Sequence, residues 1–222
     1  MLMKIMLTSV LVSITCRGAH AQLAPPVPRT QAVEIAATPP FVDPGQEIRG
    51  LALVKALRGG GFVLFMRHAF AGPPKPPCPN EAALTAEGED QARQVGVALR
   101  ELKVPIASIK ASETCRTFDT AKLLDLGQVA TNADLNPATT RRPVSEYAEQ
   151  FKYLLESPPL GSNLLLVSHV QGSAKLEERI LIDYAEIVVY RPDSSGKAQP
   201  VARVPLVAWA GLVAAAAADP AK

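Results

Sequence analysis

The sequence has no long run of basic residues: its longest such run is the pair Arg141-Arg142. The excess of basic over acidic residues is also small, 23 against 21, and two of the basic residues, Lys4 and Arg17, fall within the first 21 positions. The rest of the chain is therefore neutral. Binding through the phosphate backbone of nucleic acids needs a basic surface, so the composition argues against a nucleic-acid partner.

Cysteine is scarce as well, with three residues in 222, which excludes a miniprotein held together by disulfides. The apolar content of 48% excludes a disordered tail, and we find neither a collagen-like nor any other internal repeat. A chain of this length can bury one substantial hydrophobic core.

The first 21 residues have the features of a secretory signal peptide. A positive start at Lys4 precedes an apolar run, Ile5–Ile14, and a small-x-small end follows at Ala19-His20-Ala21. We expect cleavage before Gln22 and a secreted or periplasmic protein. The alternative is an uncleaved N-terminal anchor.

No apolar run is long enough to span a membrane as a helix, which takes roughly 20 residues. No stable membrane span is therefore expected once the signal is removed. Cys16 could suggest lipoprotein processing, but Ser13-Ile14-Thr15 lacks the aliphatic and small residues that precede such a cysteine.

Composition divides the remaining chain into three parts. Residues 22–45 are rich in proline and are predicted to be a linker. Residues 46–212 are predicted to form the folded domain. Residues 213–222 are rich in alanine and are expected to be a frayed C-terminal tail.

Within the domain, apolar periodicity predicts helices that alternate with strands. The helices are predicted from Glu47 to the glycines at 59–61, from Thr85 to Leu102, from about Glu113 to Leu126, and between Val144 and Leu155. The strands are predicted at Phe62–Met66, Ile106–Ala111, Asn163–Val167, Ala185–Tyr190 and Val201–Val207. This alternation is typical of one α/β domain.

Outside the signal peptide the chain has two histidines, and both follow apolar strands. His68 comes after Phe62–Met66, and His169 after Asn163–Val167. Open parallel sheets bind ligands at the carboxyl ends of their strands, so both imidazoles can lie in one crevice. The alternative for either histidine is a hydrogen-bonded core residue, and their matching placement makes that alternative less favourable.

Two arginines accompany the histidines. Arg67 lies at the end of a buried strand, where an uncompensated guanidinium costs several kcal/mol, so it needs an anion. Arg116 lies in the first turn of the helix after Ile106–Ala111, where the helix dipole favours negative charge, although alone it could be a solvated surface residue. Together with the imidazoles, the arginines form a clamp suited to a phosphoryl dianion.

Four segments resemble motifs of one family, the histidine phosphatase superfamily, also called phosphoglycerate mutase-like. They occur in the family's order between about residues 60 and 170, and the small secreted branch near the phosphohistidine phosphatases is the most similar. The segments are Met66-Arg67-His68-Ala69, Leu84–Gly88 with Gln91-Ala92, Ser112–Ala121 around Arg116, and Val167-Ser168-His169. The resemblance implies a three-layer α/β sandwich in which helices flank a mostly parallel central sheet.

The resemblance also implies a mechanism, that of a phosphomonoester hydrolase. His68 takes the phosphoryl group from a small phosphorylated substrate or a phosphoprotein, and water then hydrolyses the phosphohistidine. Arg67, Arg116 and His169 hold the phosphoryl oxygens, so neither a metal nor another cofactor is needed.

Two features depart from the family pattern. Ala69 replaces the usual glycine and is expected to put a methyl group near the phosphate. No residue matches the carboxylate that protonates the leaving oxygen in many relatives: Glu146 is best placed by chain order, but it could be a solvated residue on an amphipathic helix. These departures favour the alternative of a catalytically degenerate protein that binds a phosphorylated or other anionic ligand.

Rival chemistries have little support. The Cys-x5-Arg signature of cysteine phosphatases and the G-x-S-x-G nucleophile elbow are both absent. Gly59-Gly60-Gly61 precedes a strand and lacks the Lys-Ser/Thr of a P-loop, while a two-histidine zinc site would need carboxylates that no pattern supplies. A mutase would need a lid to exclude water, and no insertion suggests one.

Cys78 and Cys115 are the cysteines that remain after signal removal. Cys78 lies in the Pro-rich loop after His68, and Cys115 directly precedes Arg116. A fold that brings Arg116 to His68 therefore brings the two thiols near each other, and in an oxidising compartment they should pair. The alternatives are two separate thiols, or a reactive thiolate at Cys115.

Overall fold

A computed structural model describes residues 42–43, 45–137, 155–169, 182–192 and 198–219. All of them belong to one unit of the chain, residues 39–222. The predicted signal peptide, most of the predicted linker and Glu146 lie outside the described residues.

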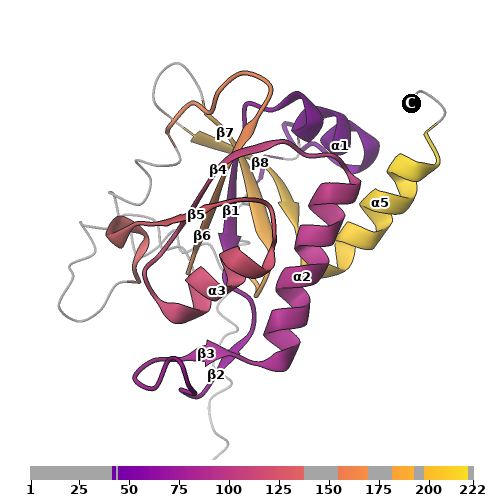
Figure 1. Cartoon of the computed structure of the whole chain (residues 1–222). Coiled ribbons are helices and arrows are strands. Elements are labelled where there is room, and N and C mark those ends of the chain that lie inside the picture. Colours follow the sequence, from indigo (N-terminus) through magenta and orange to yellow (C-terminus); the bar gives the residue numbers. More distant parts are fainter. Residues whose placement is uncertain (1–41, 44, 138–154, 170–181, 193–197, 220–222) are drawn as a thin grey trace, which may run out of the picture. The chain divides into compact units, whose positions relative to one another are not determined.

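The centre of this unit is a six-stranded sheet with the order β5-β4-β6-β1-β7-β8 (Figure 1). Strands β5, β4, β6 and β1 run parallel, β7 is antiparallel to β1, and β8 is antiparallel to β7. The strands are β1 (Val63–Arg67), β4 (Ile106–Ala111), β5 (Val129–Thr131), β6 (Asn163–Ser168), β7 (Ile187–Pro192) and β8 (Ala198–Val204). A separate antiparallel pair joins β2 (Ala71–Gly72) to β3 (Ala83–Leu84).

The central strands are apolar on both faces, as the solid runs in the sequence predict. Leu64 and Met66 of β1 contribute to one hydrophobic cluster, and Val63 and Phe65 contribute to another. These four side chains are fully buried, which places β1 in the middle of the core.

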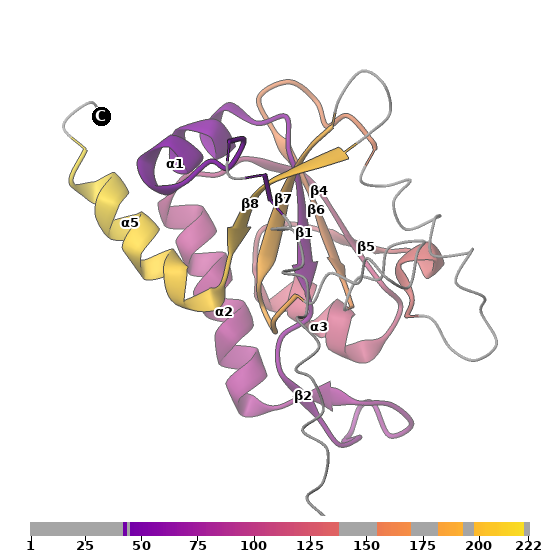
Figure 2. The ribbon, with the colours of Figure 1, turned by 180° about the vertical axis from the view of Figure 1, so that it is seen from behind.

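Four helices contribute to the first cluster and so cover one face of the sheet (Figures 1 and 2). They are α1 (Gly50–Gly59), α2 (Ala86–Glu101), α3 (Cys115–Leu123) and α5 (Trp209–Ala217). On the other face, the cluster includes Leu135 of the short helix η1 (Ala133–Leu135) and Ile182. The helix predicted between Val144 and Leu155 falls almost entirely outside the described residues.

The predicted α/β architecture with a mostly parallel central sheet is confirmed. The three helices predicted to begin near Glu47, Thr85 and Glu113 are present as α1, α2 and α3, and the central residues of each predicted strand lie in a strand. Thr85 caps α2 as expected, since its hydroxyl accepts a hydrogen bond from the backbone of Gly88. The strand predicted at Val201–Val207 is too long: β8 ends at Val204, and after Pro205 the chain forms the short helix η4 (Leu206–Ala208). The short strands β2, β3 and β5 were not predicted.

The expectation of a frayed tail from residue 213 is wrong as far as Ala217. Residues 209–217 form α5, and its Trp209, Leu212 and Ala216 are buried against the core. Alanine has the highest helix propensity, and a run of alanines on a packed helix is therefore ordered rather than frayed. No helix among the described residues is both long and apolar enough to cross a membrane.

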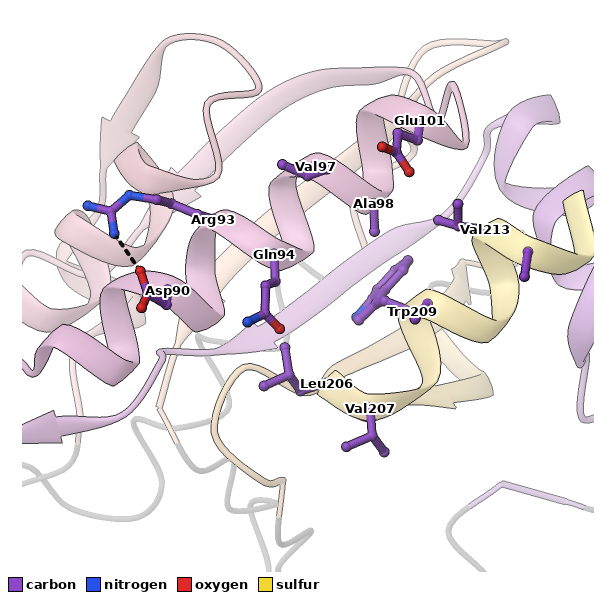
Figure 3. A pocket seen from close by; sticks show the side chains of 12 residues that line it. Asp90, Arg93, Gln94, Val97, Ala98, Glu101, Leu206, Val207, Trp209 and Val213 are labelled. Carbon is purple, nitrogen blue, oxygen red and sulfur yellow. Dashed lines mark hydrogen bonds and ion pairs between the residues drawn. The ribbon is translucent and has the colours of Figure 1, made fainter. Parts of the chain in front are cut away.

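A groove of about 740 Å³ lies between α2 and the η4–α5 segment (Figure 3). Its lining is largely apolar and includes Val97, Ala98 and Val213, with Trp209 lying between the two helices. It contains neither of the two histidines and none of the arginines that the motifs single out. The groove is therefore separate from the candidate active site.

Candidate active site

The two histidines are brought together by the register of the central strands. β1 pairs with β6 so that their last residues, Arg67 and Ser168, lie opposite each other. The residue that follows each strand is a histidine, His68 after β1 and His169 after β6. The ring centroids of His68 and His169 are 5.3 Å apart, with an interplanar angle of 68°. Both residues are buried, at 6% and 8% exposure, and the structure brings the two imidazoles together at this edge of the sheet.

The hydrogen bonds of His68 define its tautomer. Its Nδ1 lies 2.8 Å from the carbonyl oxygen of Ala69, which can only accept, so Nδ1 carries the proton. Nε2 therefore holds the free lone pair, and the Nε of Arg116 donates to it over 3.3 Å. The His68 backbone donates to the carbonyl of Ser168 over 2.9 Å, which holds the residue at the strand end.

His169 has the opposite tautomer. The Nη2 of Arg116 lies 3.3 Å from its Nδ1, and because a guanidinium only donates, Nδ1 must accept. The proton is then on Nε2, which donates to the hydroxyl of Ser112 over 3.0 Å. The guanidinium of Arg116 is thus bound by both imidazoles at once.

Both imidazoles are electrically neutral at physiological pH. The pKa of His68 is lowered from 6.5 to about 4, mainly by burial and also by Arg116 and Arg67, while the bond to Ala69 opposes these effects. Burial also lowers the pKa of His169, and to a greater extent, followed by the effects of Arg116, His68 and Arg67. A neutral His68 with an unprotonated Nε2 has the protonation state that a nucleophile requires.

We expect nuclear magnetic resonance to find opposite tautomers in these two rings. At about pH 7, correlations between ring protons and ring ¹⁵N nuclei should place the proton on Nδ1 of His68 and on Nε2 of His169. Because the pKa of His68 is lowered to about 4, its signals should remain those of a neutral ring well below the ordinary value of 6.5. An imidazolium spectrum for His68 near pH 6, or the same tautomer in both rings, would contradict this assignment.

The guanidinium of Arg67 is held by two contacts, and its Nε has no partner among the described residues. Its Nη1 donates to the carbonyl of Ile182 over 2.7 Å, and its guanidinium lies 3.7 Å from the centroid of the Tyr184 ring. Its Nε is buried and has no hydrogen-bond partner among the described residues. A buried unpaired donor costs about 1–3 kcal/mol, so Arg67 has a site for an acceptor beside the histidines.

Arg116 occupies the second position of α3, where the helix N-terminus faces the two rings. Burial lowers its pKa, while Glu81 and Tyr184 raise it. The Oε2 of Glu81 lies 3.7 Å from its Nη1. The structure therefore brings Arg116 into contact with both histidines, and the partly exposed carboxylate of Glu81 lies beside it.

The disulfide between Cys78 and Cys115 is present, with their Cα atoms 6.3 Å apart. It joins the Pro-rich loop after β1 to the first residue of α3, next to Arg116. The alternatives of two separate thiols or a reactive thiolate do not apply to this bonded pair.

Ala69, which follows the nucleophile, packs in the core. The residue is fully buried and belongs to the large hydrophobic cluster. Its backbone donates to the Thr120 hydroxyl over 3.0 Å, and that hydroxyl donates to the carbonyl of Arg116 over 2.6 Å. Ala69 therefore connects the nucleophile's strand to the helix that carries the clamp.

The Leu84–Gly88 motif holds the segment that follows His68. The backbone of Phe70 donates to the Gln91 side chain over 2.9 Å, and its carbonyl accepts from the backbone of Thr85 over 3.1 Å. A Cβ atom at Gly88 would lie only 2.0 Å from the carbonyl oxygen of Phe70, so only glycine permits this approach. The motif thus positions the segment that follows His68.

Sequence reasoning missed three residues of the site: Ser112, Tyr184 and Glu81. Ser112 is the first residue of the Ser112–Ala121 motif, so its position in that motif could have indicated a role. Tyr184 and Glu81 lie in irregular segments outside the helices and strands and carry no pattern. Among the described residues, no group of three or more His, Cys, Asp or Glu side chains could hold a metal ion.

Comparisons with known proteins found no matching family model and no matching curated protein. Solved structures do match. The protein histidine phosphatase SixA in complex with tungstate is 18% identical, with 66% of this chain and 97% of that chain covered and a TM-score of 0.48. The phosphohistidine phosphatase SixA of Agrobacterium tumefaciens is 13% identical, with coverage of 65% and 98% and a TM-score of 0.46.

A phosphoserine phosphatase from Entamoeba histolytica, solved with phosphoserine, is 11% identical, with coverage of 65% and 97% and a TM-score of 0.47.

Proposed function

We propose that this protein is a phosphomonoester hydrolase of the histidine phosphatase superfamily that forms a phosphohistidine on His68 without a metal ion. The observation that carries the proposal is the position of Arg116. Its guanidinium donates to Nε2 of His68 and to Nδ1 of His169, each over 3.3 Å, so the nucleophilic lone pair faces a cation. A phosphoryl group that approaches Nε2 meets that positive charge.

The reaction begins with attack by Nε2 of His68 on phosphorus. The Nε2–P bond forms as the P–O bond to the leaving group breaks, and negative charge on the phosphoryl oxygens is stabilised by Arg116 and by the unpaired Nε of Arg67. His169 orients the Arg116 guanidinium through its Nδ1. Water then attacks phosphorus and releases phosphate, which restores His68.

We expect hydrolysis of a generic phosphomonoester, with competitive inhibition by phosphate or vanadate. Arg116→Ala should weaken both turnover and inhibition by ~2 kcal/mol or more, about 30-fold, because it removes a charge-assisted contact from a partly buried site. Arg93→Ala is a suitable control, since Arg93 forms its ion pairs with Glu89 and Asp90 on the surface of α2.

A chelator should leave this activity unchanged. Loss of activity in chelator that a divalent ion restores would contradict the metal-free mechanism. Binding of vanadate without turnover of any phosphomonoester would instead identify the degenerate, anion-binding protein.

The substrate class that fits this site is a small phosphorylated molecule or a phosphoprotein, because the clamp contacts the phosphoryl group itself. We also propose a secreted or periplasmic location, supported by the signal-like features of residues 1–21 and by the pairing of Cys78 with Cys115.

A further inference from the structure

Glu81 is a carboxylate at the edge of the anion clamp, on the loop between β2 and β3. Its Oε2 lies 3.7 Å from Nη1 of Arg116, and 37% of its side chain is exposed. Among the described residues, it is the only carboxylate that forms an ion pair with Arg116 or Arg67. It is also more exposed than His68 and His169, whose exposed fractions are 6% and 8%.

The fold restrains this loop at both ends. Three residues before Glu81, Cys78 is bonded to Cys115, the neighbour of Arg116. Two residues after it, β3 begins and pairs with β2. Glu81 is therefore held near Arg116 by covalent and backbone contacts, and its ion pair is not a chance contact of a free loop.

Two other glutamates of the described residues, Glu186 and Glu113, are already engaged. Glu186 is buried and bound by Arg203 through contacts of 2.6 and 2.7 Å, and it also accepts from the backbone of Asp183. Glu113 accepts from the Asn136 side chain over 2.9 Å. Neither side chain is bonded to Arg67, Arg116 or a histidine.

None of the four residues of the clamp can supply a proton to the leaving group. Arginine does not release a proton in proteins. The Nδ1 proton of His68 is bonded to the Ala69 carbonyl, and the Nε2 proton of His169 is bonded to the Ser112 hydroxyl. A phosphomonoester of an alcohol, whose alkoxide is a poor leaving group, therefore needs another acid.

We propose that Glu81 is this acid, an inference that rests on the proposed function. Glu81 enters this reaction protonated, after the phosphoryl group of the substrate has replaced it as the partner of Arg116. As Nε2 of His68 bonds to phosphorus and the ester P–O bond breaks, the carboxyl proton of Glu81 moves to the departing oxygen, which leaves Glu81 as a carboxylate. In the second step, the Glu81 carboxylate takes a proton from the water that attacks phosphorus. The Nε2–P bond breaks, phosphate leaves, and both residues return to their starting states.

The test uses the dependence of the rate on the leaving group. Wild type and Glu81→Gln are compared on 4-nitrophenyl phosphate, whose stabilised phenolate leaves without protonation, and on an alkyl ester such as glycerol phosphate. Loss of a general acid should lower kcat/KM on the alkyl ester by ~100-fold or more and on the nitrophenyl ester by less than ~5-fold. Glu81→Asp should recover part of the loss on the alkyl ester. Asp90→Asn, on the exposed surface of α2, is the matched control.

An equal loss on both esters would overturn the proposal, since it would show that Glu81 acts only through the charge and position of Arg116. An unchanged rate on both esters would overturn it as well. Failure of the proposed function would give a different result. Either wild type would hydrolyse neither ester, or the His68→Ala variant would hydrolyse the two esters at the same rates as wild type. Thermal unfolding of each variant confirms that differences in rate do not come from loss of the fold.

Discussion

Replacement of His68 by alanine is expected to lower kcat/KM for phosphomonoesters by at least ~1000-fold, because it removes the nucleophile from the reaction. Wild-type protein stopped with acid-free denaturant during turnover of a ³²P-labelled substrate should carry a label that is lost in acid and retained in base, as a phosphohistidine is. His68→Ala should carry none.

The expectation follows from three features of one side chain. His68 is neutral because burial lowers its pKa to about 4, its Nδ1 proton is bonded to Ala69, and its free Nε2 faces Arg116. His68→Asn is a useful second variant, because an amide can keep a bond to the Ala69 carbonyl and so preserve the local structure. Turnover and labelling that survived in both variants would show that another group receives the phosphoryl group.

The same site shows why much of it could be predicted from the sequence. His68 and His169 each follow a solid apolar run, and such runs are local signals of buried parallel strands. Once β1 and β6 are neighbours, their register places the residues after Arg67 and Ser168 side by side. Arg116 has a similar local signal, since it lies in the first turn of α3, the helix that follows β4.

Other features depend on contacts between distant segments and have no local signal. Glu81 reaches Arg116 only through the fold of a Pro-rich loop, and Tyr184 stacks on Arg67 from a segment more than 100 positions away. α5 is another example: its alanines look like a low-complexity tail until Trp209 and Ala216 are seen to pack on the core. Tertiary packing decides such cases, and a single sequence does not display it.

The disulfide between Cys78 and Cys115 is expected to make a large contribution to stability. Cys78 and Cys115 are separated by 37 positions, and a bond that closes a loop of this size is expected to add ~3–4 kcal/mol to the free energy of unfolding by restricting the unfolded chain. Replacing both cysteines by alanine should therefore lower the unfolding free energy by that amount, measured by denaturant titration of the oxidised wild type and the variant.

The double substitution should also affect catalysis, because the bond joins the loop of Glu81 to the residue before Arg116. A looser loop predicts a higher KM and a weaker affinity for vanadate, while the His68 tautomer, set by its contact with Ala69, should stay the same. Reduction of the wild type should reproduce both effects, whereas the cysteine-free variant should be insensitive to reductant. Cys16 lies in the predicted signal peptide, so the cleaved protein would hold no other thiol. Two titratable thiols in denatured protein that was never reduced would show that the bridge does not form.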